Sequence, residues 1–359
     1  MSEFRRKLMM AYAANKRSDD IIYPGLIAAW SAKGKTNEDT DRAILKDLTG
    51  NGHDITLNNF AYSGMSGYGG YNTKFFNTKE NTITANIQKN KLNVTNITGN
   101  GKFAYNWANG FSDIIYSSYK IQVKGLKDTM NLVYVYYNEK KERKEVNLIE
   151  DGIYQIPDGY GIKETGIIDF FGFDISNFTG ECNLIIELLP EYPDALVFDG
   201  VDDWGISKSL PILTDYTIIV KRVFLDNEKG YSGTIAAKGV NPENLGAFCF
   251  ERNDNTYYSQ TSFGEGSRIK IDKNVEISWQ TTLSYLGKAI HRGSLLDEPT
   301  FTIGTAFSRY LFLKGAIYSA YLFDRSLDDQ EIKSFIRKYI DPEYLLPSEI
   351  PTPPPISAR

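Results

Sequence analysis

The sequence is poor in the residues that build metal centres and disulfide frameworks. Its 359 residues include two cysteines, Cys182 and Cys249, and two histidines, His53 and His291. No CxxC pair occurs and the histidines lie far apart along the chain, which argues against a zinc site and against a disulfide framework. Because cysteine is among the most often buried residue types, we predict that both cysteines are buried free thiols.

Motifs for membranes, nucleotides and export are also missing. No apolar run reaches the ~18 residues that a membrane-spanning helix needs, so we expect none. The chain has no P-loop, GxGxxG or GxSxG motif, and the GYGGY stretch at 67–71 lacks the lysine and helix of a phosphate loop. The start, MSEFRRKLMMAYAANKR, has no apolar stretch of signal-peptide length. We therefore expect a chain made in the cytoplasm that would reach the exterior by lysis or within a particle.

The overall composition favours β structure. Aromatic residues make up 13% of the chain, with 24 Tyr and 20 Phe against 5 Met, and aromatic side chains favour strands. The net charge is −5 with both signs interspersed, which argues against a nucleic-acid binder, because such proteins carry a basic patch. The length suffices for two domains or for one large β domain.

Short apolar runs recur along the chain and predict an all-β architecture. Within 76–192, several runs alternate with period 2 and predict an antiparallel sandwich: 119–126, 131–138, 144–149, 152–157, 167–175 and 182–190. The pattern then resumes at 194–200, 216–225, 233–239, 247–253, 276–285, 301–306 and 315–325. Segment 327–340 predicts a helix, because apolar residues such as Phe335 recur at helical spacing and Asp328 and Asp329 enrich its first turn.

The two ends of the chain differ in composition from the β-rich region between them. Segment FRRKLMMAYAANK predicts a short amphipathic helix with Leu8, Met9 and Tyr12 on one face. This segment would anchor the chain to a partner protein; the alternatives are a helix that docks on its own domain and a frayed terminus. The last fourteen residues contain five prolines and predict an extended tail.

The stretch ALVFDGVDDWGIS, residues 195–207, places Asp199, Asp202 and Asp203 close together after an apolar run. Carboxylate and amide oxygens are the ligands that calcium prefers, so these residues are candidate calcium ligands. Asp47 and Asn51 of the DLTGNG turn are candidates for the same reason. The alternative is that the aspartates cap tight turns by bonding their own backbone.

Three segments together resemble the laminin-G-like, or concanavalin A-like, lectin superfamily. They are LIAAWSA followed by LKDLTGNGHDITL, then ALVFDGVDDWGIS followed by YTIIVKRVF, and finally LKGAIYSAYLFDRSLDDQEIKSFI. The resemblance implies a concanavalin A-like jelly-roll sandwich, with calcium sites at loop edges. The order of the segments matches the family, and they cover about 25–60 and 194–340.

The same resemblance implies a split domain with an insertion. Residues 1–20 would form an N-terminal anchoring helix, 21–75 and 193–341 the lectin-like domain, and 342–359 a proline-rich tail. Residues 76–192 would form an inserted second β-sandwich. The end of this insertion, FGFDISNFTGECNLIIELLP, resembles the last strands of a jelly-roll carbohydrate-binding module.

Sugar binding calls for exposed aromatic faces beside polar hydrogen-bonding groups. Two stretches, RNDNTYYSQ and FSRYLF, combine such residues, and their candidates are Arg252, Asn255, Tyr257, Tyr258, Arg309 and Tyr310. Tyr68 and Tyr71 join them if their glycine-rich loop is exposed. Trp204 and Trp279 lie in strand patterns, where tryptophan is more often part of the core.

The sequence gives little support to catalysis. A glycosidase needs two carboxylates facing each other across a sugar, roughly 5–10 Å apart. In this fold they typically occur as E-x-D-x-x-E along one strand, and no such run is present. We therefore expect a protein that is not an enzyme, with a glycan-degrading enzyme as the weaker alternative.

The whole layout resembles proteins encoded by bacteriophages and prophages of gut anaerobes. That resemblance implies a virion surface or fibre protein, attached to other virion proteins through its N-terminal segment and bound to glycans of bacterial or mucosal surfaces. A homo-oligomer is the default expectation, without nucleic acid and without membrane insertion. A purely structural virion protein that binds no sugar is the alternative that this sequence leaves open.

Overall fold

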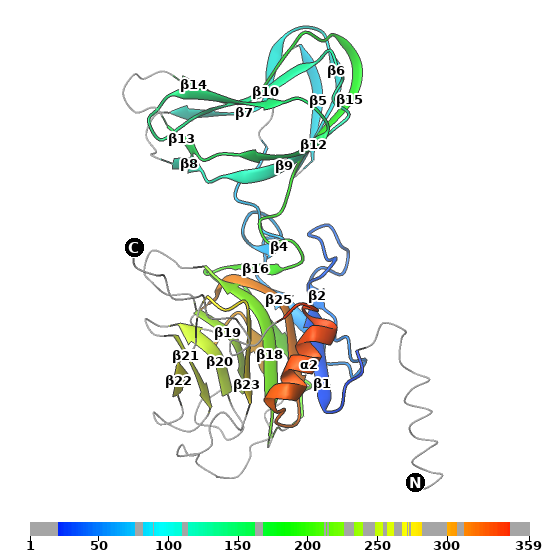
Figure 1. Ribbon diagram of the computed structural model, residues 1–359, viewed down its shortest axis with the longest axis vertical. Coiled ribbons are helices and arrows are strands. Elements are labelled where there is room, and N and C mark those ends of the chain that lie inside the picture. Colours follow the sequence, from blue (N-terminus) through cyan, green and yellow to red (C-terminus); the bar gives the residue numbers. More distant parts are fainter. Residues whose placement is uncertain are drawn as a thin grey trace, which may run out of the picture. The chain divides into compact units, whose positions relative to one another are not determined.

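The computed structural model is mainly β, with several antiparallel sheets and the helix α2 near the C-terminal end (Figure 1). It describes residues 21–75, 82–88, 90–109, 114–161, 168–211, 213, 215–225, 233–239, 248–253, 257–261, 268–270, 272, 274–281, 300–306 and 312–344. The predicted N-terminal helix and the tail beyond residue 344 lie outside these ranges. Among the described residues, no helix has the length and apolar character needed to span a membrane.

The chain divides into two units. Unit one combines the residues up to Phe60 with those from Asp194 onward, and unit two is Ala61–Pro193. The predicted insertion began at residue 76, fifteen residues later. Residues 61–75 belong to unit two partly because Gly69 and Gly70 accept hydrogen bonds from the backbone of Tyr192 and Glu191, at 2.8 and 2.9 Å. These bonds tie the start of the unit to its end.

The first sheet of unit one is built around the long strand β25 (Lys314–Phe323). Strand β18 (Thr217–Phe224) pairs along one edge of β25 and continues to β23 (Ile277–Thr281). Strands β1 (Leu26–Ser31) and β16 (Leu196–Asp199) share the opposite edge, each pairing with one half of β25. Segments far apart in the sequence are thereby joined in one sheet.

The second sheet of unit one contains eight strands, all paired antiparallel. In spatial order they are β2 (Ile44–Leu45), β3 (Ile55–Asn58), β17 (Trp204–Ser207), β24 (Phe301–Ile303), β19 (Gly233–Lys238), β20 (Phe248–Asn253), β21 (Tyr257–Thr261) and β22 (Arg268–Lys270).

The two faces of the first sheet bury different partners, as the alternation of strand side chains requires. On one face, Trp30 of β1 stacks on Phe301 of β24, with ring centroids 5.1 Å apart, so the second sheet packs there. On the other face, Ala29, Ile219 and Phe323 join one hydrophobic cluster with residues of α2. Unit one therefore has three layers: a helix, a sheet and a second sheet.

Helix α2 (Asp329–Tyr339) lies within the predicted segment 327–340. Its N-cap is Asp328, whose side chain accepts from the backbone of Glu331, while Glu331 bonds back to the N–H of Asp328. Such a capping box stabilises a helix start by about 1 kcal/mol. The helix buries Ile332, Phe335 and Ile336 against the first sheet.

Unit two contains two larger antiparallel sheets and a two-stranded ribbon. One sheet has the order β11 (Arg143–Leu148), β10 (Asn131–Tyr137), β14 (Ile168–Ser176) and β7 (Gly101–Asn109). The other has the order β12 (Gly152–Ile156), β9 (Tyr119–Lys124), β15 (Gly180–Leu188), β6 (Lys91–Ile97) and β5 (Ile83–Gln88). Strands β8 (Ile114–Tyr116) and β13 (Gly159–Tyr160) form the ribbon, and β4 (Gly67–Tyr68) precedes all of these strands.

One hydrophobic core joins the two larger sheets of unit two. Val94 and Ile186 from one sheet and Phe103 and Phe173 from the other belong to a single buried cluster. The rings of Phe103 and Phe173 stack at 5.5 Å. Each sheet thus buries one face against the other, which is how an antiparallel sheet with one polar face is stabilised.

Both cysteines are free thiols, as predicted. Cys249 is buried in β20, whereas Cys182 in β15 is only partly buried. Partial burial raises the pKa of the Cys182 thiol. The raised pKa keeps the thiol protonated, and a protonated thiol is a poor nucleophile.

Candidate functional site

The three clustered aspartates lie where the chain passes from the first sheet of unit one to the second. Strand β16 ends at Asp199 and β17 begins at Trp204, so four residues make the crossing. Gly200 has φ +84°, and a Cβ there would approach the Cβ of Lys314 to 2.9 Å. The glycine is therefore needed both for the left-handed backbone and for the close approach to β25.

Backbone hydrogen bonds hold two of these carboxylates in place. Asp203 is fully buried, and its Oδ2 accepts from the N–H of Asp199 at 3.1 Å. Asp199 in turn accepts from the N–H of Val201 through Oδ1, at 2.8 Å. Asp199 is half-buried and Asp202 is exposed. This bonding is what the turn-capping interpretation predicts.

The same turn also brings three carboxylates together. Each of Asp199, Asp202 and Asp203 offers an oxygen, and these oxygens all lie within 4.8 Å of one another. No other group of three or more histidine, cysteine, aspartate or glutamate ligands is found within the described parts of the chain. Calcium takes about six to eight oxygen ligands, so three carboxylates would need carbonyl oxygens or water to complete its shell.

Asp47 and Asn51, the other predicted calcium ligands, are used by the fold. The Asp47 carboxylate accepts from the backbone N–H groups of Ala29, Thr49 and His53 at 3.1, 2.9 and 3.0 Å, and from the Thr49 hydroxyl. The side chain of Asn51 donates to the carbonyl of Ile27 at 2.8 Å. Both residues thus tie the turn after β2 to β1, and Asp47 is not part of the acidic cluster.

Half of the predicted sugar-binding residues lie on two paired strands of the second sheet. Arg252 of β20 is directly opposite Tyr258 of β21, and Asn253 is opposite Tyr257. A register shift between Cys249 and Arg252 marks an irregularity in β20 just before this pair. The remaining candidates, Asn255, Arg309 and Tyr310, lie outside the described residues.

The other aromatic candidates are largely enclosed. Trp204 and Tyr68 are buried. Trp279 is half-buried, and its ring lies edge-on to Tyr344 with centroids 6.4 Å apart. Tyr71 is half-buried, and its hydroxyl accepts from Asn90 at 3.3 Å. The two tryptophans are therefore used in packing, as the strand pattern predicted.

A buried ion pair near β20 escaped the sequence analysis. Arg222 of β18 and Glu251 of β20 form two hydrogen bonds, from Nε at 2.7 Å and from Nη2 at 2.9 Å. Arg222 also donates to the carbonyls of Asp272 and Val275. The pair joins the two sheets of unit one immediately before Arg252.

A serine and a histidine also meet in unit one. Nδ1 of His53 lies 3.0 Å from Oγ of Ser209, which donates to the carbonyl of Gly52 at 3.4 Å. Burial lowers the pKa of His53, and the negative charge of Asp47 acts in the opposite sense. A Ser-His-Asp triad places the aspartate on the ring nitrogen Nδ1. Here Asp47 bonds the backbone N–H of His53, so this arrangement is not a triad.

Comparison with known proteins gives only distant structural likeness. No family model matches the sequence, and no curated protein matches it. The chain is distantly similar to Trypanosoma rangeli sialidase in complex with the inhibitor DANA, at 9% identity and TM-score 0.29 over 81% of this chain and 67% of that one. The same sialidase with sialic acid matches at 10% identity and TM-score 0.29, over 83% of this chain and 68% of that chain.

Proposed function

We propose that this chain is a non-enzymatic, glycan-binding surface protein, a fibre or decoration component of a bacteriophage virion. In this proposal, unit one is a laminin-G-like, concanavalin A-like lectin sandwich. Unit two is an inserted β-sandwich of the carbohydrate-binding-module type. The ligands would be glycans of bacterial or mucosal surfaces, and residues 1–20 would attach the chain to other virion proteins, in a homo-oligomer as for most fibres.

One observation carries the lectin-like part of this proposal. The three segments that resemble the lectin superfamily lie on hydrogen-bonded neighbours: β1 pairs with β25, β16 pairs with β25, and β3 pairs with β17. Segments separated by more than a hundred residues meet in register, for example Ala29 opposite Tyr321 and Leu196 opposite Ile317. If the resemblance of the three segments to the lectin superfamily were accidental, there would be no reason to expect their strands to pair with one another.

The acidic cluster supplies a place for calcium in this proposal. Asp199 and Asp202 are accessible and could share a cation with Asp203. Because Asp203 is fully buried, it cannot face a sugar together with Asp202 as a catalytic pair would have to. Calcium binding therefore suits this cluster better than glycoside hydrolysis.

A purely structural virion role is the second candidate. Ile149 and Ile153 are 79% and 63% exposed at and beside the edge strand β12 of unit two. Exposed apolar side chains beside an unpaired strand edge favour a contact with another protein. In this case the sheets would serve assembly and would bind no sugar.

The test is binding of the labelled, full-length protein to a panel of bacterial capsular and mucosal glycans, with calcium and with chelator. We expect binding that calcium strengthens. The double variant Asp199→Asn/Asp202→Asn removes two charges but keeps an oxygen acceptor for the N–H of Val201. It should weaken calcium-dependent binding at least about tenfold. Asp128→Asn, an exposed change in unit two, is the matched control.

The outcomes separate the candidates. Binding that is indifferent to chelator and to the double variant keeps the glycan-binding role and removes calcium from it. Absence of binding to every glycan, even when the protein is displayed at high valency, contradicts the lectin-like role and favours the structural one. Loss of polysaccharide on incubation would contradict the non-enzymatic proposal.

A further inference from the structure

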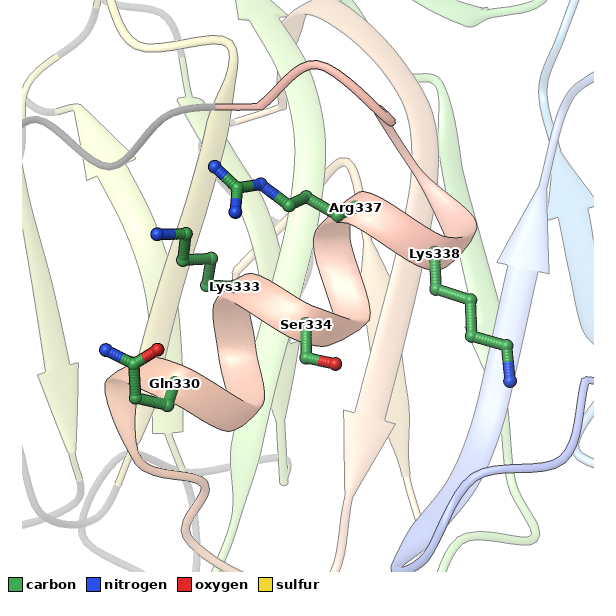
Figure 2. A pocket seen from close by; sticks show the side chains of 5 residues that line it. All are labelled: Gln330, Lys333, Ser334, Arg337 and Lys338. Carbon is green, nitrogen blue, oxygen red and sulfur yellow. The ribbon is translucent and has the colours of Figure 1, made fainter. Parts of the chain in front are cut away.

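The solvent face of helix α2 carries a pocket of about 440 Å³. Its lining residues are polar or positively charged: Gln330, Lys333, Ser334, Arg337 and Lys338 (Figure 2). None of these described lining residues is acidic, although the chain as a whole has a net charge of −5. The volume lies in the range of about 300–1,000 Å³ that is typical of small-molecule sites. The pocket is open to solvent rather than enclosed, and its lining suits a polar or charged ligand rather than an apolar one.

The packing of the helix fixes the direction of these side chains. Ile332, Phe335 and Ile336 are buried against the first sheet, so α2 cannot rotate about its axis. Lys333 and Arg337 extend to one side of the helix and Lys338 to the other, with Ser334 between them (Figure 2). A binding site on a rigid element is more precise than one on a loop.

Local contacts also position Arg337 and Lys338. Nε of Arg337 donates to the carbonyl of Tyr344 at 2.8 Å, which links the side chain to the segment after the helix. Nζ of Lys338 lies 4.9 Å from the ring centroid of Tyr339. Side chains that are already held in place lose less conformational entropy when a ligand binds.

The helix dipole accounts for only some of the positive charges on α2. Arg337 and Lys338 in the last turn favour the negative end of the helix dipole. Lys333 lies in the middle of the helix, one turn before Arg337, and like charges at this spacing are destabilising. Partial burial lowers the pKa of Lys333, and the positive charge of Arg337 lowers it further.

We infer that the α2 pocket binds the anionic groups of an acidic polysaccharide. The inference rests on the proposed glycan-binding function and assigns it a ligand class, glycans that carry sulfate, carboxylate or phosphate. Cations beside a hydroxyl and an amide suit a charged sugar, which offers both an anion and hydroxyl groups.

An anionic membrane is a less suitable partner for the same charges. A helix that binds a membrane surface inserts its apolar face between the lipids. The apolar face of α2 is buried inside unit one, so only its polar face is available.

The test compares dextran sulfate with unsubstituted dextran, which share one backbone and differ in charge. We expect the full-length protein to bind dextran sulfate and not dextran, more weakly at about 300 mM than at 50 mM salt. The double variant Lys333→Gln/Lys338→Gln should lower the affinity for dextran sulfate at least about fivefold and reduce its salt dependence. Lys208→Gln, an exposed change outside α2, should leave both unchanged.

Three results would overturn the inference. The first is that the double variant binds dextran sulfate as tightly as the parent protein does. The second is that the parent protein does not bind dextran sulfate. The third is that the parent protein binds phosphatidylglycerol vesicles more tightly than dextran sulfate and that the double variant loses this vesicle binding. The glycan panel is a separate readout. If the parent protein binds panel glycans but not dextran sulfate, the proposed function stands and only the α2 inference fails.

Discussion

Arg222 and Glu251 form a buried, two-armed ion pair that connects the two sheets of unit one. Both side chains are almost completely buried, at 0% and 2% exposed, and the guanidinium of Arg222 lies 4.8 Å from the ring centroid of Phe224. A planar guanidinium matches both carboxylate oxygens at once, which a lysine could not do. The pair therefore fixes the spacing between β18 and β20, next to the predicted sugar-binding residues of β20 and β21.

Removing one member of this pair should destabilise unit one strongly. We expect Arg222→Met to lower the free energy of unfolding by about 3–5 kcal/mol, because the Glu251 carboxylate would be left buried without its partner. Chemical denaturation measures the change. The neighbouring Lys221→Met breaks an exposed pair with Glu276 instead and should cost less than about 1 kcal/mol. Equal costs for the two variants would contradict the structural role assigned to Arg222.

Asp47 should stabilise the fold whether or not calcium is present. Asp47→Ala removes an acceptor used by the backbone of Ala29, Thr49 and His53, and we expect a loss of about 2–3 kcal/mol in unfolding free energy. The loss should be the same with calcium and with chelator. Asp41→Ala, which breaks only an exposed pair with Lys35, should cost less than about 1 kcal/mol. A loss that depended on calcium would return Asp47 to the list of metal ligands.

His53 should make the protein less stable in mild acid. Burial lowers the pKa of His53 below the ordinary histidine value of about 6.5, so the unfolded chain binds a proton more readily than the folded one. The resulting stability is present above pH 6.5 and is lost as the pH falls from there through the folded pKa. Thermal melting from pH 8 to pH 5 checks this. The variant His53→Gln should show a smaller decrease below about pH 6.5, and an identical decrease would contradict the assignment.

Much of the secondary structure could be predicted because its signals are local. The predicted strand 216–225 corresponds to β18, Thr217–Phe224, and the predicted helix 327–340 contains α2. In both cases the spacing of apolar residues within one segment is sufficient. The turn at Asp199 was identified for the same reason, since its three aspartates lie within five residues of sequence.

The features that depend on distant partners could not be predicted. The alternation of Ile218, Val220 and Arg222 along one strand indicates that Arg222 points toward the core. Its partner, Glu251, lies 29 residues away on the other sheet, and only the stacking of the sheets brings them together. The basic residues of α2 were visible in the sequence, but an ordinary solvated helix face has the same pattern.

Gly304 should not tolerate any side chain. The steric clash that a side chain would cause can be measured separately from the cost of the left-handed backbone. Gly304 has φ +75°, and an added Cβ would collide with the ring of Phe198, which is fully buried on β16. Gly34 has nearly the same φ, +73°, but a Cβ there would meet nothing within 4 Å. Gly34→Ala therefore measures the cost of the left-handed backbone alone, which we expect to be about 1–2 kcal/mol. Gly304→Ala should cost about 1–3 kcal/mol more, because the packed ring of Phe198 must move. Urea denaturation of both variants gives the difference, and a difference near zero would mean that Phe198 can shift freely and does not fix the packing between the two sheets.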